Sequence, residues 1–369
     1  MGNLPKLSDL QEKSDYEKER NIPNYLTKIQ HKAKGTIKNI SSYLTRFDNY
    51  LVETYHKPNE TVFSEILAYS EDKRYRVIFD ILQDYANYLG TKENHVGTNK
   101  ISAGYVRHSI STIRNYLRFF GFKITKEDLT DNVTLPRIIE EERVPLVREK
   151  LQSLTNEVTG NRRIMYFVMT SSGLRINEVI RLRKRDFILD EYDRVMVKVS
   201  AQISKTRKPR ITFISRESER LLRPILDKIN DNDCPFNQKN RQWENHRHQE
   251  ELVFERIRKK LGYNDRYESG VHHISLTDSF RSWFVTKCNR IDFGFGHALA
   301  GHETYMKRYD RMSTKEKVDF YIKAEKTLQV NSYLDDEKNE KIQEVYLNRI
   351  SDLENEMNSI RELLKRKTV

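Results

Sequence analysis

Arg175 occupies a position where an arginine is electrostatically unusual. It opens an apolar-periodic helix directly after a glycine-containing turn, between Ser171 and Glu178. A cation at this end of a helix opposes the positive pole of the helix dipole unless an anion binds there. Backbone N–H groups and a guanidinium fork that converge on one point form a phosphate site, and Glu178 can hold the arginine in place. The alternative is an ordinary surface salt bridge, and this segment alone does not separate the two.

Further cationic and nucleophilic groups follow along the chain. Alternating apolar runs at 195–199 and 211–213 flank the basic stretch 205–210, which predicts a β-hairpin with a cationic tip. Arg281 then lies among helix-compatible aromatics, and a Gly-His pair ending at His302 precedes two tyrosines. Together with Arg175, these residues supply the groups needed for phosphoryl transfer.

The ordered set Gly-Leu-Arg-x-x-Glu, hairpin lysine, second arginine, Gly-His and tyrosine resembles the tyrosine recombinases, also called the phage-integrase family, and most closely their archaeal branch. The resemblance spans roughly 147–330. It implies the catalytic positions Arg175, Lys205, Asp278, Arg281, His302 and Tyr309, with Glu178 in support.

Two positions depart from the family pattern. The family usually has histidine or lysine three residues before the second arginine, and this chain has Asp278. The spacing from His302 to Tyr309 is seven residues, where the family commonly leaves about nine. Tyr305 therefore remains the alternative nucleophile, and the proton-transfer role of Asp278 stays open.

The resemblance implies chemistry that these residue types can perform. Because a phenol has a reference pKa near 10, Tyr309 needs nearby positive charge to attack a phosphorus atom. Arg175 and Arg281 would clamp the non-bridging phosphate oxygens, and Lys205 would protonate the departing 5′ oxygen. The product would be a 3′-phosphotyrosyl DNA. No metal or other cofactor is expected, since the arginines supply the charge.

The charge balance agrees with a double-stranded DNA partner. The chain has 66 Lys+Arg against 54 Asp+Glu, a net charge of +12, and such an excess favours polyanions through counterion release. We expect no membrane partner because no apolar run of about 18 residues occurs. Two distant cysteines, Cys234 and Cys288, indicate no disulfide framework. They suit a reducing cytoplasm, where we expect the protein to be associated with the nucleoid.

The pattern predicts a mainly α protein with one small β-sheet, an α+β class. Five segments are expected, namely a charged N-terminal arm at 1–25, a helical core-binding domain at 26–128, a linker at 129–146, a catalytic domain at 147–333 and a coiled-coil-like C-terminal helix at 334–369. The last segment carries an apolar seam at alternating spacings of four and three. It forms either an intermolecular coil or a helix packed on its own domain.

Several basic residues are candidate DNA contacts. They lie on one face of the predicted helix 106–120 and at the hairpin tip, as Arg107, Arg114, Arg118, Arg207, Lys208 and Arg210. A solvated polar face is the alternative for the helix.

The sequence thus favours a site-specific recombinase, an integrase of a mobile element or a chromosome-resolving relative, acting as a homotetramer on paired DNA sites. A type IB topoisomerase-like enzyme uses the same chemistry without paired sites. A non-catalytic DNA-binding protein on the same scaffold is the other alternative, and Asp278 is the residue that favours it.

Overall fold

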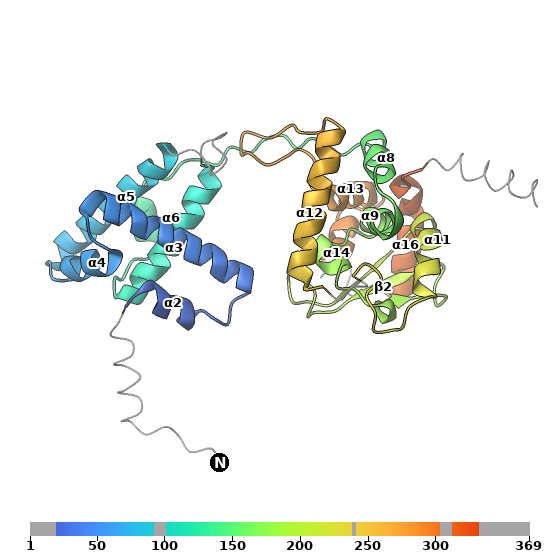
Figure 1. Cartoon of the computed structure of the whole chain (residues 1–369), viewed down its shortest axis with the longest axis horizontal. Coiled ribbons are helices and arrows are strands. Elements are labelled where there is room, and N and C mark those ends of the chain that lie inside the picture. The colour runs from blue at the N-terminus through green and yellow to red at the C-terminus, as the bar shows by residue number, and fades with distance from the viewer. Residues whose placement is uncertain (1–19, 92–100, 238–240, 303–311, 332–369) are drawn as a thin grey trace, which may run out of the picture. The chain divides into compact units, whose positions relative to one another are not determined.

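The chain divides into two units in a computed structural model, which describes residues 20–91, 101–237, 241–302 and 312–331 (Figure 1). The helical unit comprises residues 1–142 with the loop 266–271, and the sheet-containing unit comprises 143–265 with 272–369. Most of the predicted arm at 1–25 lies outside the described residues. The whole of the predicted coiled-coil-like segment at 334–369 lies outside them as well.

The helical unit is built from amphipathic helices whose ends are set by local capping. Its helices are α2 Ile22–Lys28, α3 Lys34–Tyr55, α4 Asn59–Leu67, α5 Glu71–Thr91, α6 Ala103–Phe120 and α7 Lys126–Asn132. At the start of α6, the Ser102 side chain accepts a hydrogen bond from Tyr105 N, as an N-cap does. The helix ends at Gly121, which has φ +111°.

Apolar side chains at three- and four-residue spacing form the core of the helical unit, as the sequence predicted. On α6 these are Val106, Ile110, Ile113, Leu117 and Phe120, all buried. Aromatic rings fill the space between helices, with the Phe47 and Tyr85 ring centroids 4.9 Å apart in a T-shaped contact.

The first residues of the predicted linker at 129–146 are helical. Thr125 and Asp128 form a reciprocal capping box that starts α7, so residues 129–132 are helical. The next residues are fixed to the helical unit, because Thr134 N donates to Gln83 Oε1 at 2.7 Å and Arg107 Nε donates to Pro136 O at 2.8 Å.

The sheet-containing unit is mostly helical with one small sheet, which confirms the predicted fold class. Its elements are α8 Arg148–Asn156, α9 Gly160–Ser172, α10 Ile176–Val179, the 3-10 turn η1 Lys184–Asp186, β1 Phe187–Ile188, β2 Met196–Val199, β3 Arg210–Phe213, α11 Arg216–Leu226, α12 Trp243–Lys260, α13 Ser279–Cys288, α14 Phe295–Ala300 and α16 Thr314–Leu328. No helix in the described part of the chain is both long and apolar enough to cross a membrane.

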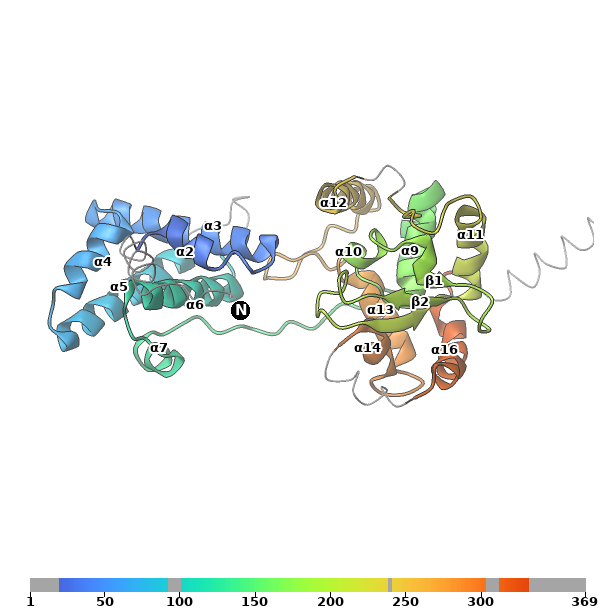
Figure 2. The ribbon, with the colours of Figure 1, turned by 90° about the horizontal axis from the view of Figure 1, so that it is seen from below.

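The sheet confirms the predicted hairpin. Its strand order is β1-β2-β3, and all pairs are antiparallel. The register pairs Met196 with Phe213 and Val199 with Arg210, which places Arg210 at the strand end next to the basic loop. Helices α9 and α14 both pack against β3, and Figure 2 shows them on opposite sides of the sheet.

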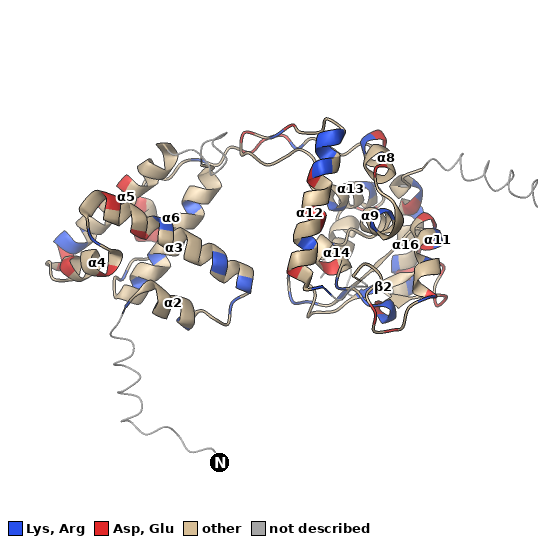
Figure 3. Cartoon of the chain, in the orientation of Figure 1, with Lys and Arg blue, Asp and Glu red and all other residues tan. Residues whose placement is uncertain are grey.

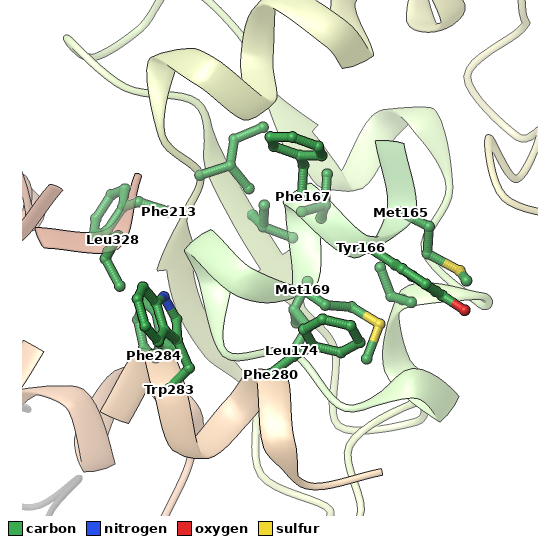
Figure 4. Close-up of a cluster of buried hydrophobic side chains, with 14 of the residues drawn as sticks. Met165, Tyr166, Phe167, Met169, Leu174, Phe213, Phe280, Trp283, Phe284 and Leu328 are labelled. Atoms are coloured by element: carbon green, nitrogen blue, oxygen red, sulfur yellow. The ribbon is translucent and has the colours of Figure 1, made fainter. Parts of the chain in front are cut away.

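Helix α9 is the centre of the apolar core. It packs against α8, α11, α13 and α16, and its residues from Met165 to Ser172 are all buried. Figure 4 shows Tyr166 and Met169 of α9 with Phe280 and Phe284 of α13 in this cluster. Because the C-terminal part of α9 is buried against several helices, the turn that follows it is fixed by the core of the unit.

Candidate functional site

The turn after α9 requires glycine for two reasons. Gly173 has φ +64°, which side-chain-bearing residues rarely adopt. A Cβ atom built there would lie 2.3 Å from Phe284 Cδ1. Arg175 follows with extended backbone and is the N-cap of α10. The sequence predicted that Arg175 opens the helix, and the structure places it one residue before the four-residue helix α10.

Glu178 holds two arginines with one carboxylate. Its oxygens accept hydrogen bonds from Arg175 N at 2.9 Å and Arg175 Nη1 at 3.1 Å. They also accept from Arg210 Nη1 at 3.1 Å and Nη2 at 2.5 Å. Burial alone raises the pKa of the Glu178 carboxyl, but Arg210 and Arg175 outweigh it, so that this pKa is lowered. Glu178 is therefore ionised, and it binds both the backbone N–H and the guanidinium of Arg175.

Arg210 is placed differently from the expectation for a DNA contact. Its side chain is 3% exposed. Besides its two bonds to Glu178, its Nε donates to Leu299 O at 3.0 Å. Each of its donor nitrogens thus has a partner within the protein. The hairpin register turns Arg210 inward onto a carboxylate 32 positions earlier in the chain, a contact that no local pattern shows.

Arg281 is buried in α13 and only partly satisfied. Its Nη1 donates to Gly173 O at 2.6 Å, while Nη2 is buried without a hydrogen-bond partner among the described residues. Burial and then the charges of Arg175 and Arg210 lower the pKa of Arg281 to about 9, against the opposing effect of Glu178 and Asp278. A buried guanidinium with an unused donor beside another arginine is a site for an anion.

Three carbonyl groups at the end of α9 are each capped from a different element. Helix ends leave such carbonyls without intrahelical partners. Tyr321 Oη donates a hydrogen bond to Ser171 O at 2.7 Å, and Thr212 Oγ1 donates one to Ser172 O at 2.7 Å. Arg281 Nη1 donates the third, to Gly173 O at 2.6 Å. Helix α16, strand β3 and helix α13 therefore all fix the turn that presents Arg175.

His302 lies beside this cluster and is paired with a second histidine, His297. The two Nδ1 atoms are 2.5 Å apart. Burial, followed by Arg281, His297, Arg175 and Arg210, lowers the pKa of His302 to about 4. Burial and Arg281 also lower the pKa of His297. The sequence did not predict a role for His297, which stands five residues before His302 and reaches it because α14 ends at the left-handed Gly301.

Asp278 is exposed at the N-cap of α13. Its carboxylate makes no capping hydrogen bond, and its influence on Arg281 is through charge alone. Its geometry assigns it no contact with Arg175 or Arg281 among the described residues.

The remaining candidate residues that the structure describes take no part in the contacts given above. Lys205, Arg207 and Lys208 are exposed in the loop between β2 and β3. In the helical unit, Arg107 and Arg118 are exposed on α6, and Arg114 is half-buried; basic residues on α6 are visible in Figure 3. Tyr305 and Tyr309 lie outside the described residues, which resume at Met312.

No group of three or more histidine, cysteine, aspartate or glutamate side chains with metal-binding arrangement occurs within the described ranges. The described part of the site is instead an arginine cluster with a histidine pair at its edge.

Comparisons with known proteins were made for both sequence and structure. No protein-family model matches the sequence, and no curated protein does. Among the solved structures that it resembles are recombinases and integrases at low sequence identity. One is XerH site-specific recombinase bound to difH substrate, with 14% identity, a TM-score of 0.48 and coverage of 81% of this chain and 82% of that chain. Another is Tn1549 transposon integrase in complex with a circular intermediate DNA, with 13% identity, a TM-score of 0.46 and coverage of 76% of this chain and 98% of that chain. A third is a lambda integrase dimer bound to a COC′ core site, with 14% identity, a TM-score of 0.42 and coverage of 74% of this chain and 98% of that chain.

Proposed function

We propose that this protein is a site-specific DNA recombinase that cuts and rejoins DNA through a 3′-phosphotyrosyl intermediate at Tyr309. The observation that carries the proposal is the unpartnered Arg281 Nη2, which is buried beside Arg175. A DNA phosphate satisfies this donor and the local excess of positive charge at once. The ordered sequence boxes support the same assignment.

Each residue of the cluster then has a task in cleavage. Arg175 and Arg281 bind the non-bridging oxygens of the phosphate, where negative charge grows as the phenol oxygen attacks. Neutral His302 accepts the phenolic proton. The bond from phosphorus to the 5′ oxygen breaks as Lys205 donates its proton to that oxygen. The reverse sequence, with another 5′ hydroxyl as attacking group, rejoins the strand.

The residues around the cluster act as support. Glu178 fixes Arg175 and Arg210, and Arg210 ties strand β3 to the end of α14 through Leu299. Duplex DNA fits the net charge of +12. Exposed Arg118, Arg207 and Lys208 are the proposed backbone contacts, and recombination requires four protomers on two paired sites.

The test is a covalent-adduct assay with a nicked DNA substrate whose cleaved fragment diffuses away. Wild type and Tyr305→Phe should form the protein–DNA adduct. Tyr309→Phe should bind the same DNA, measured by electrophoretic mobility shift, and form no adduct. An adduct formed by Tyr309→Phe at the wild-type rate would contradict the assignment of the nucleophile.

The second candidate is a non-catalytic DNA-binding protein, favoured by exposed Asp278 at a position where the family has a proton-transferring residue. It predicts DNA binding without any adduct from the wild-type chain. A type IB topoisomerase-like activity would instead give relaxation of supercoiled DNA that lacks paired sites.

A further inference from the structure

Helix α14 ends in a backbone motif that brings two histidines together. Gly301 has φ +84°. Its N–H donates to Ala298 O at 2.9 Å, and His302 N donates to His297 O at 2.9 Å. This pair of bonds defines a Schellman motif, in which the residue after the glycine contacts the residue five positions earlier. The contact is usually apolar, but here both positions carry imidazoles.

The short contact between the rings constrains where their hydrogens lie. A hydrogen bond between two Nδ1 atoms at 2.5 Å needs one nitrogen with a hydrogen and one with a lone pair. Two neutral rings must therefore be opposite tautomers. If His302 carries its hydrogen on Nδ1, its Nε2 has a free lone pair, and His297 carries its hydrogen on Nε2.

The surrounding charges favour this arrangement. Arg175, Arg210 and Arg281 all act electrostatically on His302. Positive charge favours a lone pair and opposes an N–H dipole on a nearby ring nitrogen, and Nδ1 of His302 is already engaged by His297, so the effect falls on Nε2. His297 is acted on by Arg281 alone among these arginines, so a positive charge is better tolerated on His297 than on His302.

We propose that His297 is a positioning residue that holds His302 in the Nδ1–H tautomer and takes over its proton during cleavage. His302 Nε2 accepts the phenolic proton, the hydrogen on His302 Nδ1 passes to His297 Nδ1, and His297 becomes the imidazolium. His302 is left neutral with its hydrogen on Nε2. This role in cleavage rests on the proposed function, whereas the tautomer does not. Histidine orientation by a second group at Nδ1 is the same logic that orients a catalytic base in hydrolases.

Two substitutions separate the hydrogen bond from the packing. His297→Leu supplies the apolar contact typical of a Schellman motif but offers no acceptor. His297→Asn supplies an amide oxygen that accepts from His302 Nδ1 but cannot take its proton. His248→Asn, an exposed position on α12, is the matched control.

The first readout is the pair of imidazole ¹⁵N shifts of His302, measured by NMR in the full chain without DNA. Wild type and His297→Asn should carry the hydrogen on Nδ1, and His297→Leu should carry it on Nε2. An identical His302 tautomer in wild type and His297→Leu overturns the proposal, whatever the outcome of any cleavage assay.

The second readout is the single-turnover rate of adduct formation alongside the Kd for the same DNA. His297→Leu should slow the chemical step at least tenfold, with the Kd unchanged, and His297→Asn should recover only part of the rate. A wild-type rate in His297→Leu overturns the role of His297 in an active enzyme. If the wild type forms no adduct, the proposed function fails, and the nitrogen shifts alone decide whether His297 sets the tautomer.

Discussion

Arg281 donates a 2.6 Å hydrogen bond to the carbonyl of Gly173, two residues before Arg175. The second arginine of the site therefore caps the turn that presents the first one. The two guanidinium groups are positioned by one shared piece of backbone, and Arg281 Nη2 has no hydrogen-bond partner among the described residues. Under the proposed function, this preorganisation lowers the cost of ordering the two cations when a DNA phosphate binds.

Glu178→Gln tests the carboxylate that holds Arg175 and Arg210. Removing one partner of a buried ion pair leaves uncompensated charge, so the free energy of unfolding should fall by about 3–5 kcal/mol. Both tryptophans, Trp243 and Trp283, lie in the sheet-containing unit, and their fluorescence in urea therefore measures this unit.

Glu255→Gln is the matched control for Glu178→Gln. Glu255 pairs with Lys259 one turn away on α12, and its side chain is 41% exposed. Loss of this exposed pair should cost no more than about 0.5 kcal/mol. Equal effects of the two substitutions would contradict a special role for the buried carboxylate.

Gly173→Ala tests the shape of the turn. The positive φ costs roughly 1–2 kcal/mol for alanine, and the overlap with Phe284, which is fully buried, adds about 1–3 kcal/mol. Gly160→Ala has a positive φ as well but nothing within 4 Å of the new Cβ. The tryptophan transition should shift clearly further for Gly173→Ala than for Gly160→Ala, and adduct formation should be lost only in the former.

Tyr321→Phe tests whether α16 supports the site. Removal of the hydroxyl leaves the buried Ser171 carbonyl without its side-chain donor, at a cost of about 1–3 kcal/mol. Tyr192→Phe, at a half-buried position in the same unit, should leave the urea midpoint within error of wild type. A neutral effect of Tyr321→Phe would mean that the Ser171 contact does not hold the turn.

Local sequence patterns predict most of the secondary structure. The features that the sequence did not predict depend on contacts between residues far apart in the chain. The periodicity of α6 and the alternation flanking the hairpin depend on neighbours a few residues apart, and the structure confirms both. Arg210 reads as a surface residue because its partner Glu178 is 32 positions away. The contact between His297 and His302 depends on the left-handed backbone of Gly301, which the sequence alone does not show. Tyr309 and the seam at 346–364 lie outside the described residues and stay predictions.

The histidine pair predicts how stability depends on pH. The pKa of His302 is about 4 in the folded chain, below the ordinary value near 6.5. Between these values the unfolded chain binds more protons than the folded chain, so the free energy of unfolding falls as pH drops from about 6.5 to about 4. The groups that act on His302 are Arg281, His297, Arg175 and Arg210.

His302→Gln removes this contribution, so the variant should lose less stability than wild type between pH 6.5 and pH 5. Urea unfolding followed by tryptophan fluorescence at several pH values measures the slope. Coincident slopes for the two proteins would contradict the neutral state assigned to His302. Buried Glu178, whose pKa is lowered, adds its own loss only at more acidic pH.

Lys205 is exposed in the β2–β3 loop, and its proposed task as general acid can be tested by changing the leaving group. Lys205→Ala should slow cleavage of ordinary DNA by about 10²–10⁴-fold. A substrate with sulfur at the 5′ bridging position should restore most of the rate, because a thiolate leaves without prior protonation. Lys208→Ala, on the same loop, should weaken DNA binding. The ratio of its cleavage rates on the two substrates should equal the wild-type ratio. If the sulfur substrate does not rescue Lys205→Ala, this lysine binds the DNA backbone and another group protonates the 5′ oxygen.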